Sequence, residues 1–351
     1  MNRVAVIGHF GGNNHFCDGQ TIKTKNTAEL LEKQNFFDVI YVDTYYFRTN
    51  KVRLLADTLR AMFSCEHIFL LVSVNGIRVY LPLLYFLNKF AKKPIYHYII
   101  GSELLDMVAK NPKLVKYLNA LTVNWFEYES GTRYLREKGV TNAETLVNFK
   151  MITPVEQAVP YRIENGTFRF CTFSRVMEEK GITDAIRTVR ELNKKQGKCI
   201  ALLDIYGPLE AAYEKSFYEL LAENKDCVRY MGIADSRKSV EILKDYYALL
   251  FPTCWAGEGV PGTVIDAFAA GIPVIASDWN ANREIIEDGK QGILYPNGDL
   301  ETLEAAVCWA VGHPEEMDRM RMESRRAYRA YMPETVLNVI LKEMEKQEVT
   351  Q

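Results

Sequence analysis

The sequence predicts an α/β protein built from two parallel sheets, each covered by helices. Three observations support this prediction. Short apolar runs rich in β-branched residues alternate with longer helical patterns, this rhythm occurs twice along the 351 residues, and a stretch without a clean period separates the two series. A chain of this length is also expected to form about two domains.

In the first half, each expected strand is a short apolar run followed by a helical pattern. These strands are expected at residues 4–8, 38–42, 68–72, 95–100 and 121–123. The rhythm resumes after Gly166, with strands expected at residues 168–173, 200–206, 228–231, 248–251 and 274–276. Between the halves, residues 151–160 include Pro154 and Pro160 and form the best candidate linker.

Three segments follow from this pattern. We expect one domain over residues 1–155, a second over residues 156–333, and a charged C-terminal helix over residues 334–351 that could pack back on the first domain. In open parallel sheets, ligands bind outside the carboxyl ends of the strands, so the loops after the strands are the places to look for a site.

Composition excludes several classes of protein. Lys and Arg total 43 against 45 for Asp and Glu, a formal charge of -2, so no global field would attract nucleic acid. The cysteines lack metal-ligand spacing, which favours buried free thiols in a reducing compartment; they are Cys17, Cys65, Cys171, Cys199, Cys227, Cys254 and Cys308. Because no apolar run approaches the ~20 residues of a membrane-spanning helix, we expect a cytoplasmic protein.

The most informative segment is a glycine-rich turn with two acids, Gly257-Glu258-Gly259-Val260-Pro261-Gly262-Thr263-Val264-Ile265-Asp266. Its glycines and proline leave backbone N–H groups at a helix N-terminus, where anions and hydroxyl oxygens bind. Glu258 and Asp266 would repel a bare phosphate but accept hydrogen bonds from hydroxyls. The turn therefore predicts a site for a sugar. The alternative is that either acid only caps the helix or complements its dipole.

A basic pair follows the first strand of the second half. Arg175 and Lys180 lie five residues apart in a strand-to-helix loop, where a guanidinium fork and an ammonium together could hold a diphosphate. In the alternative interpretation both cations pair with Glu178 and Glu179 on a solvated face.

The order of these motifs resembles glycosyltransferase family 4. That family has an Arg-x4-Lys pair, a Glu-x7-Glu turn and an Ala-x-Gly-x-Pro-Val-Ile strand entry; the last six positions of this strand entry are Ala270-Gly271-Ile272-Pro273-Val274-Ile275 here. The resemblance is strong from Phe168 to Asp299 and weak over the first half. It implies the GT-B fold, in which two Rossmann-like domains face each other across a cleft. Residues 1–155 would be the acceptor side, and residues 156–333 would bind the nucleotide sugar.

The resemblance also implies roles for single residues. Arg175 and Lys180 would hold the donor diphosphate, and Glu258 would meet the hydroxyls of the transferred sugar. The remaining substrate-binding candidates are Gly19, Gly207, Ile233, Gly259, Pro261, Gly262, Thr263, Val264 and Asp266. Asp266 departs from the family pattern because it is one methylene shorter than Glu; we interpret it as binding the ribose hydroxyls. Gly19 would approach the donor phosphate from the first domain.

The implied reaction is retaining transfer of a hexose from a nucleotide-diphosphate sugar to a saccharide or lipid-linked saccharide, in bacterial surface polysaccharide assembly. No cofactor and no metal are expected, and a UDP-sugar is favoured over a GDP-sugar. Three alternatives stay open: a sugar-nucleotide epimerase or phosphorylase, a non-catalytic nucleotide-sugar-binding protein, and a Rossmann oxidoreductase. The last is disfavoured because the loop at residues 9–21 lacks the Gly-x-Gly-x-x-Gly fingerprint.

Two features of the first half have competing interpretations. His97 alternates with apolar neighbours and is interpreted as a hydrogen-bonded sheet histidine, so the family's sugar-facing histidine is not assigned to it. The helical pattern at residues 77–93 has an apolar side and carries Arg78, Lys89, Lys92 and Lys93. Such a helix either faces the core or rests on an anionic membrane, which would give peripheral contact with the inner face of the cytoplasmic membrane.

Overall fold

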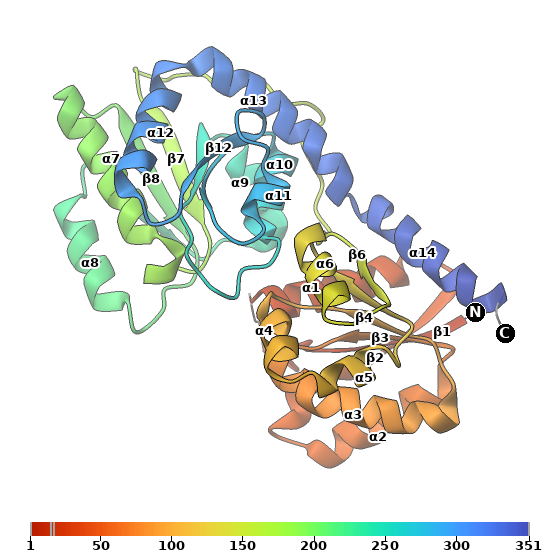
Figure 1. Cartoon of the computed structure of the whole chain (residues 1–351). Coiled ribbons are helices and arrows are strands. Elements are labelled where there is room, and N and C mark those ends of the chain that lie inside the picture. The colour runs from red at the N-terminus through yellow and green to blue at the C-terminus, as the bar shows by residue number, and fades with distance from the viewer. Residues whose placement is uncertain (1, 15, 17, 350–351) are drawn as a thin grey trace. The chain divides into compact units, whose positions relative to one another are not determined.

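The computed structural model describes residues 2–14, 16 and 18–349, which form two compact units (Figure 1). The first unit combines Met1–Met151, Gly257–Val260 and Ala330–Gln351, and the second combines Ile152–Ala256 and Pro261–Arg329. The contacts of Gly257–Val260 thus assign this short piece of the acidic turn to the first unit. The predicted acceptor and donor roles of the two domains stay predictions.

The first unit contains one parallel sheet in the order β2-β1-β3-β4-β5-β6. Its strands are β1 (Asn2–Gly8), β2 (Phe37–Asp43), β3 (His67–Leu71), β4 (Ile95–Tyr98), β5 (Val123–Phe126) and β6 (Ala143–Thr145). The chain order reverses between β1 and β3. The loops after these two strands therefore open at the switch point of the sheet.

Helices cover both faces of this sheet, as expected for parallel strands (Figure 1). They are α1 (Gly19–Glu32), η1 (Thr44–Phe47), α2 (Lys51–Ser64), α3 (Val74–Ala91), α4 (Glu103–Lys110), α5 (Lys113–Leu118), α6 (Glu129–Glu137) and α14 (Pro333–Val349). The last of these comes from the far end of the chain. Its Val336, Leu337, Ile340 and Met344 are buried in one apolar cluster with residues of the sheet, so the C-terminal helix is part of the first unit's core.

The second unit contains a parallel sheet in the order β12-β11-β10-β7-β8-β9. Its strands are β7 (Phe168–Phe173), β8 (Ala201–Tyr206), β9 (Val228–Gly232), β10 (Ala248–Phe251), β11 (Val274–Asp278) and β12 (Gly292–Pro296). The order reverses between β7 and β10, as in the doubly wound nucleotide-binding folds. A ligand crevice is expected where the loops after β7 and β10 diverge.

The helices of the second unit again lie on both sides of its sheet. They are η2 (Glu178–Lys180), α7 (Ile182–Gln196), α8 (Glu214–Glu223), η3 (Ser236–Lys238), α9 (Ser239–Leu243), α10 (Gly262–Ala270), α11 (Asn282–Ile285), α12 (Leu300–Gly312), α13 (Pro314–Ala327) and η4 (Tyr328–Tyr331). α7 and α12 pack beside each other on this sheet (Figure 1). Ile182, Ile186 and Val189 of α7 and Leu303 and Val307 of α12 are buried in the same apolar cluster.

The predicted α/β class with two parallel sheets is confirmed, and each expected strand is present. The fifth strand starts two residues later than predicted, at Val123. Two edge strands were missed: β6 is only three residues long and includes Glu144 and Thr145, and β12 lies within the segment of strong resemblance but was not predicted as a strand. No helix among the described residues has the length and apolarity needed to cross a bilayer.

Candidate functional site

Three loops at the carboxyl edge of the second sheet are joined through backbone contacts. The loop after β7 carries Arg175, the loop after β8 begins at Gly207, and β9 ends at Gly232. Gly207 donates its N–H to the Gly232 carbonyl over 2.9 Å, and the Val176 N–H bonds the Pro208 carbonyl over 2.9 Å. The predicted residues Arg175, Gly207 and Ile233 therefore lie in loops that form one continuous rim.

Gly207 is required at its position by a close approach. A β-carbon there would come within 1.7 Å of the Ser174 carbonyl oxygen, and the residue has a φ of +139°. Both constraints exclude larger residues. The glycine therefore lets the loop after β8 lie directly against the loop that carries Arg175.

The basic pair occupies two different environments. The Arg175 side chain is exposed; its guanidinium carbon lies 5.4 Å from the centre of the Trp255 ring. Lys180 is buried, with its Nζ 5.7 Å from the centre of the Phe251 ring at the end of β10. The alternative pairing of Arg175 with Glu178 or Glu179 is not observed, because no carboxylate among the described residues lies within ion-pair distance of it.

The loop after β10 is tied to the loop that carries Lys180. The Glu179 carbonyl accepts a hydrogen bond from the Cys254 N–H over 2.8 Å and from the Thr253 hydroxyl over 3.3 Å. The Trp279 indole donates to the Trp255 carbonyl over 2.9 Å from the loop after β11. The loops on both sides of the β7–β10 switch point are thus tied to each other by hydrogen bonds at the strand ends.

The N-terminus of α10 has the features of an anion or hydroxyl site. Its N-cap is Pro261, and no side chain caps its first turn. The Thr263 hydroxyl oxygen in that turn is inaccessible to solvent and has no hydrogen-bond partner in the described structure. Because that oxygen is closed to solvent, a ligand at this helix start would meet the backbone N–H groups of the first turn instead. Of the predicted contacts, Pro261, Gly262, Thr263 and Val264 all lie at this helix start.

Asp266 is more enclosed than the sequence suggested. Its carboxylate is 1% exposed, and its Oδ1 accepts a hydrogen bond from the Ser239 hydroxyl over 2.8 Å. Ser239 begins α9, so this contact joins α9 to α10. The predicted contact with ribose hydroxyls stays a prediction, and it would have to use the acceptor capacity that Ser239 leaves.

Glu258 and Gly259 belong to the first unit. Glu258 is buried, and the neighbouring Val260 is held through both of its backbone polar groups. Its N–H donates to Glu127 Oε2 over 2.8 Å, and its carbonyl accepts from Asn148 Nδ2 over 3.0 Å. The segment that carries the predicted sugar-binding acid is therefore fixed by side chains that follow β5 and β6.

The third predicted residue of the first unit is Gly19, the first residue of α1. It directly follows the N-cap Asp18, whose carboxylate accepts from the Thr21 N–H over 3.0 Å. No heavy atom lies within 4 Å of the place where a β-carbon would stand. The predicted phosphate contact of Gly19 stays a prediction; His15 and Cys17 of the same loop lie outside the described residues.

His97 is only partly the hydrogen-bonded histidine that we expected. It is fully buried in β4, and its Nδ1 bonds Asn124 Oδ1 over 2.9 Å, but its Nε2 has no partner in the described structure. Burial lowers the pKa of His97 to about 4, against the opposing effect of the Asn124 hydrogen bond; the charge of Lys23 lowers it further. The ring is therefore neutral at pH 7.

The described cysteines are free, but the expectation that they are buried holds only in part. Cys65 and Cys171 are buried and Cys227 is half-buried, whereas Cys199, Cys254 and Cys308 are exposed. Cys199 lies in the loop before β8, Cys254 in the loop after β10 and Cys308 in α12. Cys17 lies outside the described residues. The described residues contain no His, Cys and carboxylate cluster able to hold a metal.

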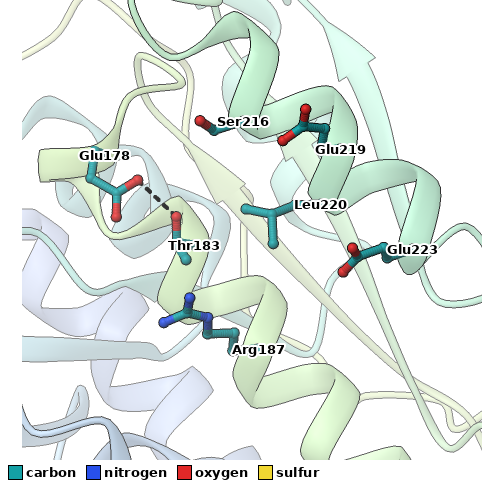
Figure 2. A pocket seen from close by; sticks show the side chains of 7 residues that line it. All are labelled: Glu178, Thr183, Arg187, Ser216, Glu219, Leu220 and Glu223. Atoms are coloured by element: carbon teal, nitrogen blue, oxygen red, sulfur yellow. Dashed lines mark hydrogen bonds between the residues drawn. The ribbon is translucent and has the colours of Figure 1, made fainter.

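A pocket of about 270 Å³ lies between α7 and α8 (Figure 2). It is lined by Glu178, Thr183, Arg187, Ser216, Glu219, Leu220 and Glu223. Within it the Thr183 hydroxyl donates to Glu178 Oε2 over 2.8 Å. Three carboxylates against one guanidinium make this pocket unfavourable for a diphosphate, so it is not a candidate for the donor site.

Sequence reasoning missed Lys23, Glu127, Asn148 and Ser239. Glu127 offered one signal, because a carboxylate directly after an apolar strand lies at the binding edge of a parallel sheet. The others are common polar residues in helices and loops, and their partners are far away in sequence.

The comparisons with known proteins concern the second half of the chain and the overall fold. Residues 167–313 match the family model for glycosyl transferases group 1. This segment is therefore similar to that family over less than half of the chain. It contains β7 to β12 and the predicted residues Arg175, Lys180, Gly207, Ile233, Pro261, Gly262, Thr263, Val264 and Asp266, together with Glu258 and Gly259 in sequence.

The curated proteins similar to this chain include glycosyltransferases of polysaccharide biosynthesis. The amylovoran biosynthesis glycosyltransferase AmsK of Erwinia amylovora is 32% identical over 144 residues, which cover 40% of this chain and 35% of AmsK. The chain thus spans about a third of AmsK. The D-rhamnosyltransferase WbpZ of Pseudomonas aeruginosa is 23% identical over 71% of this chain and 66% of its own length. CapM of Staphylococcus aureus, a capsular polysaccharide biosynthesis glycosyltransferase, is 23% identical over 78% and 69%.

Solved structures show that the fold extends over the whole chain. HepE from Anabaena, in complex with UDP, superimposes with a TM-score of 0.74 at 12% identity and covers 99% of this chain and 100% of its own. Sucrose-phosphate synthase from Thermosynechococcus elongatus gives a TM-score of 0.75 at 14% identity, covering 100% of both chains. At this identity the likeness shows the fold alone, and that fold is GT-B.

Proposed function

We propose that this protein is a retaining glycosyltransferase that moves a hexose from a nucleotide-diphosphate sugar to a hydroxyl of a saccharide or lipid-linked saccharide. The observation that carries the proposal is the N-terminus of α10, which has no side-chain cap and lies after β10. It directly follows the turn with Glu258. Arg175 and Lys180 come from the loop after β7, on the other side of the same switch point as the loop after β10.

Each group has a defined task in this reaction. As the bond between the anomeric carbon and the diphosphate oxygen breaks, negative charge grows on the diphosphate, and the two cations with the α10 amides would stabilise it. The acceptor oxygen forms the new bond to the anomeric carbon. Its proton passes to an oxygen of the leaving diphosphate, which would make a separate general base unnecessary. Retention of configuration is what the family resemblance implies.

A variant pair tests the task of the basic residues. Lys180→Met should lower turnover at least a hundredfold because the leaving diphosphate loses a desolvated positive charge. The control is Lys195→Met, which removes an exposed lysine of α7 and should leave turnover unchanged. Equal turnover in both variants would contradict the role of Lys180.

The donor is to be identified with a panel of UDP-, GDP- and TDP-sugars. Each should be scored for the rise in melting temperature and for the products formed with and without a saccharide acceptor. We favour UDP-sugars because HepE has been solved with UDP and with UDP-glucose. Epimerised nucleotide sugar without an acceptor would indicate an epimerase, and tight binding without turnover would indicate a non-catalytic binding protein.

We also propose metal independence, because Arg175 and Lys180 can supply the positive charge that a divalent ion supplies in other transferases. Turnover measured in excess EDTA should match turnover in magnesium. A loss of activity in EDTA that magnesium or manganese restores would contradict this proposal.

The setting that fits these features is bacterial surface polysaccharide assembly on the cytoplasmic face of the membrane. It is supported by AmsK, which acts in amylovoran biosynthesis, and by CapM, which acts in capsular polysaccharide biosynthesis. On α3, Phe86 and Phe90 are 58% and 67% exposed beside Lys89 and Lys92, whereas Ile77, Leu81 and Leu84 form its buried face. A core-facing role therefore explains only one side of this helix.

A vesicle assay tests membrane contact. The protein should sediment with vesicles containing phosphatidylglycerol more than with phosphatidylcholine alone, because basic residues flank the two aromatic rings. Phe86→Ser with Phe90→Ser should abolish the difference. Tyr218→Ser, at a half-exposed aromatic residue of α8, is the control and should leave it unchanged.

A further inference from the structure

The residues that hold the acidic turn are themselves part of a buried ion pair. Lys23 Nζ donates to Glu127 Oε1 over 2.6 Å and to the Ile99 carbonyl over 2.7 Å. The side chains of Lys23 and Glu127 are 3% and 8% exposed, and the ammonium lies 3.6 Å from the centre of the Tyr98 ring. A desolvated pair of this kind has a precise geometry, because a broken pair would leave an uncompensated buried charge.

The second oxygen of Glu127 leaves this pair and reaches the turn. Glu127 Oε2 accepts the Val260 N–H over 2.8 Å, while Asn148 Nδ2 donates to the Val260 carbonyl over 3.0 Å. A β-carbon on Gly259 would come within 2.2 Å of the same carboxylate oxygen. Glycine at this position is therefore what allows Glu127 to approach the backbone one residue after Glu258.

Lys23, Glu127 and Asn148 come from separate places in the fold. Lys23 lies in α1, Glu127 follows β5, and Asn148 follows β6. Their convergence at the carboxyl edge of the first sheet gives the Gly257–Val260 segment rigid support that its own glycines cannot provide. A catalytic group must be held within about 0.5 Å of its productive position, and such support comes from residues behind it.

We infer that Glu127, oriented by Lys23, is a positioning residue that holds the glycine turn through Val260 so that Glu258 meets the transferred sugar; this rests on the proposed function. Glu127 touches no reacting atom in this role. Its loss should therefore lower kcat while the KM for the nucleotide sugar stays nearly constant, because the diphosphate contacts of Arg175 and Lys180 are unchanged.

Two double variants isolate the hydrogen bond to Val260 from the ion pair. Lys23→Met with Glu127→Gln removes both charges but keeps an amide oxygen that can accept the Val260 N–H. Lys23→Met with Glu127→Leu removes both charges and the acceptor. Neither leaves a buried charge unpaired, so both should fold. They differ only in the contact to the turn.

The Gln variant should keep kcat within about threefold of the unaltered protein, whereas the Leu variant should lose at least tenfold with a KM change under threefold. Hydrogen exchange at the Val260 amide should be at least tenfold faster in the Leu variant than in the Gln variant. Equal kcat and equal Val260 exchange in the two variants would overturn the inference.

The exchange measurement also separates this inference from the proposed function. If the unaltered protein transfers no sugar from any donor, the proposed function fails, and Val260 exchange still shows whether Glu127 holds the turn. If the unaltered protein is active and the Leu variant has normal kcat with fast Val260 exchange, the turn is held by Glu127 but its position does not matter for transfer.

Discussion

Two buried charge clusters, one in the first unit and one in the second, are built differently. In the first unit, one lysine faces one glutamate, and both side chains are almost fully removed from water. In the second unit, Asp204 is 1% exposed and accepts from Arg229 over 2.8 Å, Arg169 over 3.0 Å and the Tyr246 hydroxyl over 2.7 Å. Its two arginines are 53% and 37% exposed.

The two clusters differ in the groups that donate hydrogen bonds to the oxygens of the buried carboxylate. Glu127 uses one oxygen for Lys23 and the other for the backbone of the acidic turn, at the edge of the sheet where ligands bind. Both oxygens of Asp204 are used by side chains of the neighbouring strands β7 and β9 and by Tyr246. Glu127 therefore has one carboxylate oxygen that bonds a loop at the ligand-binding edge of its sheet. Among the described residues, Asp204 bonds only side chains within its own unit through both oxygens.

The largest expected effect is on stability. Asp204→Ala should lower the free energy of unfolding by about 3 kcal/mol, because Tyr246 and two guanidinium groups lose their acceptor, although the arginines can turn toward water. Turnover per folded molecule should change less than threefold. Urea unfolding and steady-state kinetics check both. A tenfold fall in kcat would show that the second cluster also supports the site.

The second-largest expected effect is a loss of activity when the acidic turn, which Glu127 of the first cluster contacts, is altered at Glu258. Glu258→Ala should lower kcat per folded molecule at least a hundredfold, equivalent to about 2.7 kcal/mol of transition-state stabilisation. The matched control is Glu219→Ala, an exposed glutamate of α8, which should leave kcat unchanged. Normal turnover in Glu258→Ala would contradict the claim that the first cluster supports a catalytic turn.

The third prediction concerns the buried histidine beside the first cluster. The pKa of His97 is about 4 in the folded protein and near 6.5 when unfolded, so the unfolded chain binds more protons as pH falls below 6.5. His97 should therefore remove about 2 kcal/mol of stability between pH 7 and pH 5. His97→Asn should lose less stability over the same interval in urea titrations. Identical losses would show that His97 titrates normally.

The smallest effect should come from the exposed partner in the second cluster. Arg229→Met should lower the free energy of unfolding by about 1 kcal/mol, since Arg169 and Tyr246 still satisfy Asp204. High salt should reduce the difference between this variant and the unaltered protein. If Arg229→Met lowered the free energy of unfolding as much as Asp204→Ala, the second cluster would depend on the Arg229–Asp204 pair alone. It would then resemble the first cluster, which has the single pair Lys23–Glu127.

The two clusters also mark the limit of sequence reasoning. Arg175, Lys180 and the turn at Glu258 were found because their residues are neighbours in sequence and their spacing carries the chemistry. Lys23 and Glu127 are 104 residues apart, and Glu127 and Val260 are 133 apart, so no local pattern joins them. The strand β6 was missed because Ala143-Glu144-Thr145 is too short to show a period. His97 was placed correctly in a strand, but its unpartnered nitrogen depends on tertiary packing.

The tight contact between Gly207 and Ser174 has a practical consequence for redesign. A mutant library that varies residue 207 to alter donor preference should return mainly inactive or unfolded proteins, since even alanine would collide with the Ser174 carbonyl. Ile233, which is 64% exposed on the neighbouring loop and is a predicted substrate contact, can be varied without disturbing that glycine contact.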